Sequence, residues 1–345
     1  MPVTVIIGGQ FGSEGKGKVA HFFAIKQKAS FVVRVGGSNS GHTIITPSGK
    51  PIILRQLPTA AILENTKCII CAGSYINPDL LLAEIALVGL SPDRLLIDPN
   101  AMIISSEELL AEKHSLLRQD IGSTLSGTGA AVKKRIDRCA SVRLAKNEER
   151  LRHYIKPVVP IMRACLNNGG RIIIEGTQGF GLSLLHSPEY PYVTSRDTTA
   201  AAFVSEAGLS PLDIDDIVLV IRTFPIRVAG HSGFLPNEID WETVSQGSGS
   251  KVPIIEYTSV TKAVRRVAHF DPDVVLCAIM VNQPTKIVLN HLDYIDASCA
   301  TTNKLSEKTS LFVRKIESLI GCSINYLGFS RTSLVSNEFI GSVQI

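Results

Sequence analysis

Short apolar runs alternate with longer amphipathic or polar stretches along most of the chain. Runs rich in Val and Ile that are only a few residues long are typical of strands buried in a sheet. Such strands are expected at Val3–Ile7, Ser30–Val35, Leu54–Pro58, Cys68–Ala72, Leu95–Ile97, Arg171–Glu175, Ile217–Arg222 and Lys286–Leu289. Their alternation with helical stretches predicts the α/β fold class, with a large, mainly parallel sheet flanked by helices.

Capping residues mark the ends of several helices. Asn77, Pro78 and Asp79 combine an N-cap, a proline suited to the first helical position and an acid for the first turn. Further helices are expected over Gly15–Ile25, Ser106–Leu117, Asn147–Leu166, Thr198–Ala207 and Ser306–Leu319, and a surface loop over Gly230–Ser250. Because no repeat or clear linker divides the chain, residues 1–345 are expected to form a single domain with long loops.

Composition narrows the class of protein. With 45% apolar and 19% charged residues, the chain is expected to be globular. Its net charge of +4 suits small acidic substrates, and no basic stripe of the kind that binds nucleic acid stands out. No apolar run is long enough to cross a membrane, and no signal peptide precedes the first strand. Seven scattered cysteines favour a reducing cytoplasm over a disulfide framework.

The segment Gly8–Lys18, GGQFGSEGKGK, carries the first candidate chemistry. A glycine-rich turn between a strand and the start of a helix presents backbone N–H groups to a phosphate, and Lys16 and Lys18 add positive charge. The spacing differs from that of the common phosphate loop, because five residues separate Gly9 from Gly15 and neither Ser nor Thr follows the second lysine. The segment therefore predicts a phosphate site of less common design.

Segments along nearly the whole chain resemble the adenylosuccinate synthetase family, in the family's order. They read GGQFGSEGKGK, NSGHT, the loop of Thr124 with Arg138, EGTQG, YPYVTSRDTTA, EYTSVTKAVRR and NHLD. In this family a nucleoside triphosphate phosphorylates O6 of a purine monophosphate, and the amine of aspartate then displaces that phosphate at C6. The resemblance implies a fold like that of the P-loop NTPases and a ligase that forms a C–N bond. It also implies a Mg²⁺ cofactor and a cytoplasmic homodimer.

The resemblance also implies roles for individual residues. The catalytic residues would be Ser13, Lys16 and His42, with Ser13 and Gly41 at the magnesium ion. The triphosphate would be bound by Gly12, Ser13, Glu14, Gly15, Lys16, Gly17, Lys18, Gly41, His42, Thr43, Arg265, Asn290, His291, Asp293 and Gly328. The monophosphate would be bound by Ser13, Asn39, Thr124, Gln178, Thr194 and, from the other subunit, Arg138. Aspartate would be bound by Val228, Thr258, Ser259, Val260, Thr261 and Arg265.

One departure from the family pattern concerns the purine directly. Ser13 stands where the family has an aspartate, which is the base for the purine N1 proton and also contacts magnesium. A serine is shorter and is not ionised near neutral pH, so it leaves room for a substituent at C2 and can hydrogen-bond to N1–H or a 2-amino group. An aspartate carboxylate could accept hydrogen bonds from both N1–H and the 2-amino group. In this family, however, one side of that carboxylate is already bound to the metal. Water, the substrate phosphate and Ser13 itself remain candidates for the base.

Two further departures concern the sugar and the triphosphate. Ala263 stands where bacterial members have an arginine that reaches the ribose 2′-hydroxyl, which fits a deoxyribose. In the family, a lysine and an aspartate recognise the guanine of GTP. Here the aspartate is retained as Asp293, but His291 replaces the lysine, so ATP becomes the expected donor. The three departures together resemble the phage branch of the family, which makes a 2-amino product for DNA that contains diaminopurine. In that case the enzyme would work in the host cytoplasm.

The sequence therefore leads to one main hypothesis and two alternatives. The main hypothesis is an ATP-dependent ligase that joins dGMP to L-aspartate, with neither nucleic acid nor membrane as a partner. The first alternative is an ordinary adenylosuccinate synthetase, which uses IMP and GTP. The second is a nucleotide-binding protein without activity, which the retention of Glu14, Lys16, His42 and Arg265 disfavours.

Overall fold

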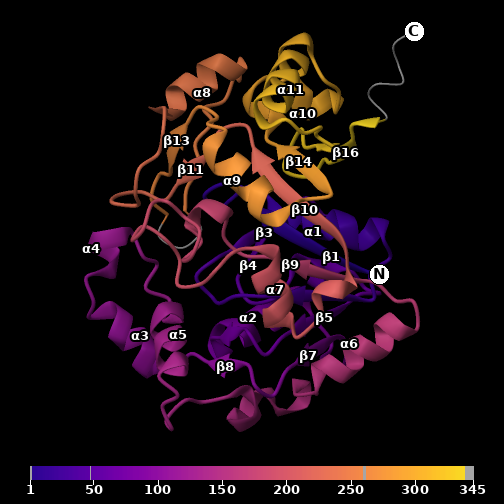
Figure 1. The fold of residues 1–345 in the computed structure, drawn as a ribbon, viewed down its shortest axis with the longest axis vertical. Helices are drawn as coiled ribbons and strands as arrows, with labels where there is room; N and C mark the ends of the chain where they lie inside the picture. Colours follow the sequence, from indigo (N-terminus) through magenta and orange to yellow (C-terminus); the bar gives the residue numbers. More distant parts are fainter. Residues whose placement is uncertain (1, 47, 259–261, 339–345) are drawn as a thin grey trace.

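A computed structural model of the chain describes residues 2–46, 48–258 and 262–338. Within these ranges a nine-stranded sheet forms the centre (Figure 1). Its order is β16 (Val335–Ser336), β15 (Tyr326–Leu327), β14 (Lys286–Asn290), β10 (Ile214–Arg222), β1 (Val3–Gly8), β9 (Ile172–Glu175), β2 (Phe31–Arg34), β5 (Lys67–Ile70) and β7 (Leu95–Ile97). Neighbouring strands from β15 to β7 pair in parallel, and β16 is antiparallel to β15. The predicted α/β class is confirmed.

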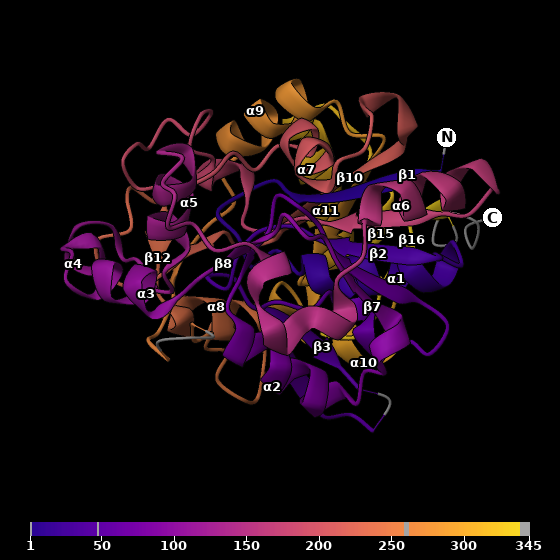
Figure 2. The same ribbon diagram turned by 90° about the horizontal axis from the view of Figure 1, so that it is seen from below.

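Helices cover both faces of this sheet, because its strands are apolar on both sides. One face packs against α6 (Val158–Asn167), α7 (Ala200–Ala207), α9 (Asp273–Asn282) and α11 (Glu307–Ile320). The other face packs against α1 (Lys16–Lys26) and α2 (Pro78–Val88). Figure 2 shows α7 and α9 on one side of the sheet and α1 and α2 on the other.

Smaller elements surround the sheet and frame its loops. The helices α3 (Ser106–Lys113), α4 (Leu117–Ile121) and α5 (Thr128–Ile136) form a group at the lower left of Figure 1. At the upper left, α8 (Trp241–Ser248) packs on a small sheet of β11 (Ile226–Arg227), β13 (Arg266–Ala268) and β12 (Glu238–Ile239). The remaining elements are the hairpin of β3 (His42–Ile45) and β4 (Pro51–Leu54), the pair β6 (Tyr75–Ile76) and β8 (Met102–Ile103), and the short α10 (Cys299–Thr302).

Most predicted elements are present, and four predictions are wrong in whole or in part. The side chain of Asn77 accepts a backbone hydrogen bond at the start of α2, as the capping pattern predicted. The helix expected over Asn147–Leu166 begins only at Val158, after Pro157, and short 3₁₀ turns precede it. The helix expected over Ser106–Leu117 ends at Lys113, and α4 begins separately at Leu117.

The expected strand Leu54–Pro58 is displaced, because β4 pairs with β3 and ends at Leu54. The segment Gly230–Ser250 is not a continuous loop. Trp241 is buried there, and Asp240 accepts a backbone hydrogen bond at the start of α8.

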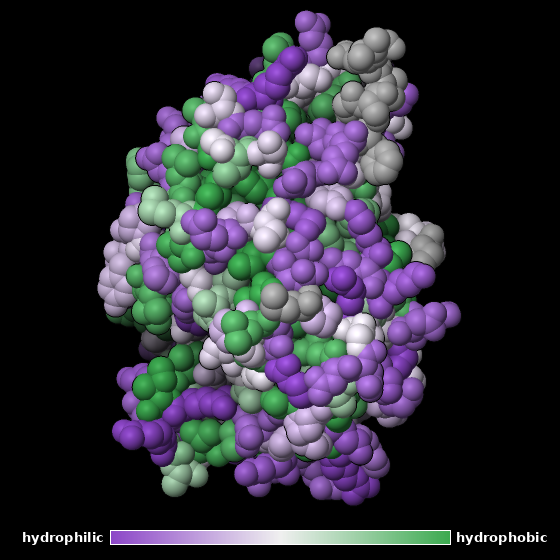
Figure 3. Space-filling model, turned by 45° about the vertical axis from the view of Figure 1, so that its right-hand side comes forward, coloured by the Kyte–Doolittle hydropathy of each residue, from purple (hydrophilic) through white to green (hydrophobic). Residues whose placement is uncertain are grey.

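The surface mixes both kinds of side chain. On the face drawn in Figure 3, hydrophobic residues are interspersed with hydrophilic ones. None of the described helices is both long and apolar enough to cross a membrane. The buried apolar side chains gather instead between the sheet and its helices, where burial stabilises the fold.

Candidate active site

Four strands of the central sheet end on a polar residue at the same edge. Arg34 ends β2, Glu175 ends β9, Arg222 ends β10 and Asn290 ends β14, and all four side chains are buried. The glycine-rich loop follows β1, which lies between β9 and β10. Because parallel strands bring their carboxyl ends to one edge, these polar groups surround the loop.

A buried carboxylate holds the glycine-rich loop in shape. Glu14 accepts hydrogen bonds from the backbone N–H groups of Gln10 (3.2 Å) and Gly12 (2.8 Å) and from Nζ of Lys16 (2.7 Å). Room for this carboxylate depends on Gly179, where an added Cβ would lie 2.4 Å from Oε1 of Glu14. The loop backbone is left-handed at Ser13, with φ of 57°. This conformation is strained for a residue other than glycine, and strained residues are concentrated at ligand-binding sites.

Two buried side chains, Asn290 and Lys18, hold the loop in place by donating to backbone carbonyl oxygens. Nδ2 of Asn290 donates to the carbonyl oxygen of Glu14 at 2.7 Å. Nζ of Lys18 donates to the carbonyl oxygens of Ser330 (2.8 Å) and Ser333 (3.0 Å). Burial lowers the pKa of Lys18 to about 8, against the charge of Asp293, which acts to raise it. Asn290 therefore shapes the loop, and Lys18 ties it to the segment between β15 and β16.

A charged network fixes His42 at the start of β3. Its Nδ1 lies 2.5 Å from Oε1 of Glu175 and 2.5 Å from Nη1 of Arg34. Burial, with a further contribution from Arg34, lowers the pKa of His42 to about 4, so the ring is neutral at neutral pH. At Nδ1 the ring meets both Arg34, which can only donate, and the carboxylate of Glu175, which accepts. In the neutral tautomer that accepts from Arg34, the proton is on Nε2, which can donate to a ligand. In the tautomer that donates to Glu175, Nε2 is an acceptor.

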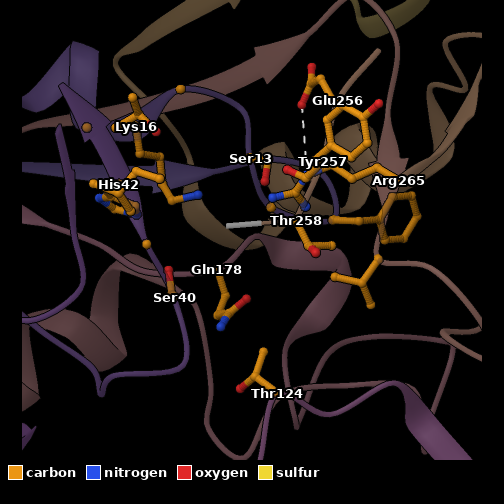
Figure 4. A pocket seen from close by; sticks show the side chains of 18 of the residues that line it. Ser13, Lys16, Ser40, His42, Thr124, Gln178, Glu256, Tyr257, Thr258 and Arg265 are labelled. Atoms are coloured by element: carbon orange, nitrogen blue, oxygen red, sulfur yellow. Dashed lines mark hydrogen bonds and ion pairs between the residues drawn. The ribbon is translucent and has the colours of Figure 1, made fainter. Parts of the chain in front are cut away.

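These residues line a cavity of about 790 Å³. Its basic side chains are Lys16, Lys18, Arg118, Lys262, Arg265 and Arg331, together with His42 and His291, whereas Glu256 is its carboxylate. Figure 4 shows Lys16 and His42 on one side, Glu256, Tyr257 and Arg265 on the other, and Ser13 between them. The excess of cations suits ligands that carry several negative charges.

Most of the residues predicted for the site line this cavity. They are Gly12, Ser13, Gly15, Lys16, Gly17, Lys18, Asn39, Gly41, His42, Thr43, Thr124, Gln178, Val228, Thr258, Arg265 and His291. The side chains of Glu14 and Asn290 lie buried outside the lining, as does Gly328. Thr194 lies next to it, since its Oγ1 is 3.5 Å from Nδ2 of Asn39. Ser259, Val260 and Thr261 fall outside the described residues.

Two predicted residues lie away from the cavity for different reasons. Arg138 is exposed just beyond the end of α5, with a left-handed φ of 54°. Asp293 is half-buried behind His291, and its Oδ1 has no hydrogen-bond partner in the part of the chain that the structure describes. Burial raises the pKa of Asp293 to about 6, although Lys18 acts to lower it.

The wall opposite His42 is built around Glu256. It accepts from Nη2 of Arg222 and from the hydroxyl of Tyr294 (3.0 Å), and its Oε2 lies 3.9 Å from Nε of Arg265. Burial alone would raise the pKa of Glu256, but the charge of Arg222 and its hydrogen bond hold that pKa at about 2. Glu256 is therefore ionised at neutral pH.

Sequence reasoning missed Arg34, Glu175, Arg222 and Glu256. Three of them had a visible signal, because each is a charged residue that ends an otherwise apolar run. A charge in that position is costly to bury unless it is paired, which points to a site at the sheet edge. Glu256 carried no such signal, since its partners are distant in the sequence.

Comparison with known proteins identifies the family. A model described as adenylosuccinate synthetase matches residues 5–146 and 140–300. The chain belongs to the adenylosuccinate synthetase family. It is therefore a ligase of the type that forms a C–N bond. The adenylosuccinate synthetase of Methanocaldococcus jannaschii is 36% identical over 331 residues, covering 94% of this chain and 93% of that protein. That of Archaeoglobus fulgidus is 35% identical and covers 92% of each.

Solved structures agree on the fold. The fully ligated adenylosuccinate synthetase from Plasmodium falciparum superimposes with a TM-score of 0.85, at 20% identity, over 98% of this chain and all of that one. The succinoaminodeoxyadenylate synthetase of cyanophage S-2L superimposes with a TM-score of 0.82, at 25% identity, over 97% and 95%. That structure is described as bound to dGMP and to dATP as an energy donor. The adenylosuccinate synthetase fold predicted from the sequence is thus confirmed.

Replacing Asp293 with asparagine is expected to stabilise the protein more at pH 8 than at pH 5. The raised pKa means that Asp293 keeps its proton in the fold where the unfolded chain loses it. Its contribution to stability is therefore present below pH 3.8 and is lost as the pH rises through about 6. We expect a gain of about 1–3 kcal/mol in the free energy of unfolding at pH 8. Denaturant unfolding at both pH values checks this, and an equal change at both would contradict it.

Proposed function

We propose that this chain joins dGMP to L-aspartate with ATP as the phosphate donor. The products are N6-succino-2-amino-2′-deoxyadenylate, ADP and phosphate, and residues 1–345 act as a single catalytic unit. The observation that carries the proposal is Ser13, which lines the cavity in a left-handed conformation where the family has a carboxylate. We place the enzyme in the cytoplasm, which is that of the host if a phage encodes it.

Ser13 suits a purine with a 2-amino group. Its side chain is exposed to the cavity and shorter than aspartate, so space remains beside C2 of a bound purine. Its hydroxyl can accept from N1–H or from the 2-amino group. The cyanophage S-2L enzyme, which is described as bound to dGMP, shares the fold over nearly the whole chain and supports this reading.

The first stage of the reaction moves a phosphoryl group to O6 of the purine. The glycine-rich loop and Lys16 line the cavity, and their backbone N–H groups and Nζ would hold the phosphates of the triphosphate. The charge that develops on O6 would be stabilised by His42, whose neutral ring donates from Nε2. In the tautomer that accepts from Arg34 at Nδ1, this neutral donor would stabilise the charge without losing its proton.

The second stage brings in the amine of aspartate. Arg265 and Thr258 lie on the wall of the cavity opposite His42 (Figure 4), and Val228 also lines the cavity. A guanidinium binds a carboxylate with two parallel hydrogen bonds, so Arg265 would hold the substrate with its amine toward C6. The amine forms the new C–N bond as the phosphate leaves with the electrons of the C6–O bond.

The family implies a magnesium ion, and the donors present fit one that arrives with the nucleotide. The carbonyl oxygen of Gly41 and the hydroxyl of Ser13 line the cavity, whereas Glu256 is already paired with Arg222. In the described ranges no group of three or more His, Cys, Asp or Glu side chains is arranged to hold a metal. Magnesium is often held by one or two protein oxygens together with phosphates and water. When bound, it would neutralise charge on the phosphates.

The base of the triphosphate would lie near His291 and Asp293. His291 lines the cavity, and burial lowers its pKa well below the usual range, so it is neutral. The unpartnered Oδ1 of Asp293 is an acceptor that the amino group of adenine would satisfy. Replacement of the family's lysine by a neutral ring removes the charge that would favour guanine O6.

Arg138 is proposed to reach the monophosphate of the partner subunit in a homodimer, because it is exposed and remote from its own cavity. We expect Arg138→Ala to raise KM for dGMP about tenfold, with KM for aspartate within twofold, since one charge-assisted hydrogen bond is worth roughly 1.5 kcal/mol. Steady-state kinetics measures both constants. The exposed Lys133 on the preceding helix, α5, is the control, and an equal effect of Lys133→Ala would contradict the assignment.

An ordinary adenylosuccinate synthetase, using IMP and GTP, is the second candidate. It is favoured by the archaeal relatives, which are 35–36% identical over more than nine-tenths of the chain. Purified protein is incubated with Mg²⁺, aspartate and either ATP or GTP, and with dGMP, GMP or IMP in turn. A succino product from dGMP identified by mass supports the proposal. A product from IMP alone would contradict it, and no product would favour a binding protein.

A further inference from the structure

Arg222 connects the glycine-rich loop to the rest of the site, although it contacts no predicted substrate. Its side chain is fully buried at the end of β10, and its Nη1 donates to the carbonyl oxygen of Ser13 at 2.9 Å. Its backbone is also held by the loop, because the Gln10 side chain accepts from its N–H at 2.9 Å and donates to its carbonyl at 3.2 Å. The guanidinium is therefore rigidly placed beneath Ser13.

The same guanidinium is paired with Glu256 on the opposite wall. Glu256 accepts from Nη2 of Arg222, and its Oε2 lies 3.4 Å from Nη1. The hydroxyl of Tyr294 donates to Glu256 at 3.0 Å and fixes its orientation. Since Glu256 directly precedes Tyr257 in the segment that leads to Thr258, it belongs to the wall expected to bind aspartate.

Glu256 is shared unequally between two arginines. It is hydrogen-bonded to Arg222, but its distance to Nε of Arg265 is 3.9 Å, which is too long for a hydrogen bond (dashed in Figure 4). Nε of Arg265 donates instead to the carbonyl oxygen of Tyr257 at 3.2 Å. A carboxylate of a ligand at Arg265 would therefore compete with Glu256 for that guanidinium without breaking a formed hydrogen bond.

We propose that Arg222 and Glu256 are positioning residues that couple the binding of aspartate at Arg265 to the placement of Ser13. When a substrate carboxylate neutralises the charge of Arg265, Glu256 interacts electrostatically with Arg222 alone. The guanidinium of Arg222 is then held more firmly in one position. Because Arg222 holds the Ser13 carbonyl, the left-handed loop residue that faces the purine is fixed by the same event. The inference rests on the proposed function in taking aspartate and a purine monophosphate as the two ligands.

Coupling of this kind is reciprocal, so each ligand raises the affinity for the other by the same factor. We expect saturating L-aspartate to tighten dGMP binding to the wild-type protein at least about fivefold. Isothermal titration with Mg²⁺ and without triphosphate measures the dissociation constant while no turnover occurs. In Glu256→Gln, which keeps the shape and one acceptor of the side chain, the ratio of the two constants is expected to fall to about one.

A matched control is available in the small sheet, where β13 pairs with β12. Arg266, next to Arg265 in the chain, is paired through two hydrogen bonds of 2.8 and 2.6 Å with Glu238, away from Ser13. Glu238→Gln removes a similar charge and is expected to keep the wild-type ratio. The ratio compares the dissociation constants for dGMP of one variant without and with aspartate. A general loss of affinity caused by a structural defect therefore does not change it. If Glu256→Gln does not fold, Arg222→Lys is measured instead, with the same expectation.

The failure of this inference can be told apart from that of the proposed function. If the protein binds IMP and not dGMP, the substrate proposal fails, and the same titrations are made with IMP. A wild-type ratio of about one with the nucleotide that binds would overturn the coupling. A wild-type ratio retained in Glu256→Gln or in Arg222→Lys would overturn the role of this pair.

Discussion

Replacing His42 with alanine is expected to lower kcat about 100- to 10,000-fold, with little change in KM for dGMP or aspartate. The reason is that a proton on Nε2 is needed as a donor where charge develops on O6. Its pKa of about 4 keeps it neutral, and the tautomer that accepts from Arg34 at Nδ1 carries the donating proton on Nε2. Steady-state kinetics with each substrate varied in turn measures the effect.

The network behind His42 provides the control for this prediction. Glu175→Gln keeps the ring in place, because Thr59 still donates to the side chain through its backbone and hydroxyl at 2.9 and 2.8 Å. We expect a smaller loss of kcat, roughly tenfold, since only the orientation of the ring is loosened. A loss below tenfold in His42→Ala would contradict the role of His42. So would a loss in Glu175→Gln that exceeds that of His42→Ala.

Replacing Ser13 with aspartate is expected to lower kcat/KM for dGMP roughly 10- to 100-fold. The longer carboxylate would crowd the 2-amino group, whereas IMP has only hydrogen at C2. We therefore expect kcat/KM for IMP to rise or to stay the same in this variant. The ratio of the two specificity constants is the measured quantity, and its reversal is the signature of a pocket that selects at C2.

Ser40 gives a matched control, because it also lines the cavity. Ser40→Asp adds the same charge away from Ser13, and we expect it to lower both specificity constants without changing their ratio. If Ser13→Asp leaves kcat/KM for dGMP unchanged, the steric argument is wrong. If both aspartate variants change the ratio equally, charge rather than position decides the choice of purine.

The sequence was sufficient to predict the main sheet from β14 to β7, but not β15 and β16 at its edge or the elements beside it. Apolar runs such as Val3–Ile7 and Ile217–Arg222 are buried on both faces, so their pattern alone indicates strands. The segment Gly230–Ser250 was misread because its glycines and serines mask a short helix that depends on burial of Trp241. Tertiary contacts of this kind override local composition and cannot be read from it.

The site divides in a similar way. Residues in motifs, such as Ser13, Lys16 and His42, were predicted and do line a common cavity. The groups that hold them were not, because Glu175 and Arg222 act through partners more than a hundred residues away. Sequence pattern therefore located the groups that face the ligand, whereas their protonation and orientation required the fold.

The most direct test of the central claim is a competition between the two purines. Equal concentrations of dGMP and IMP are supplied to the wild-type protein with Mg²⁺, aspartate and ATP, and the two succino products are quantified by mass at low conversion. Their ratio equals the ratio of kcat/KM values. We predict that N6-succino-2-amino-2′-deoxyadenylate exceeds adenylosuccinate at least tenfold, about 1.4 kcal/mol of discrimination. An excess of adenylosuccinate would contradict the account.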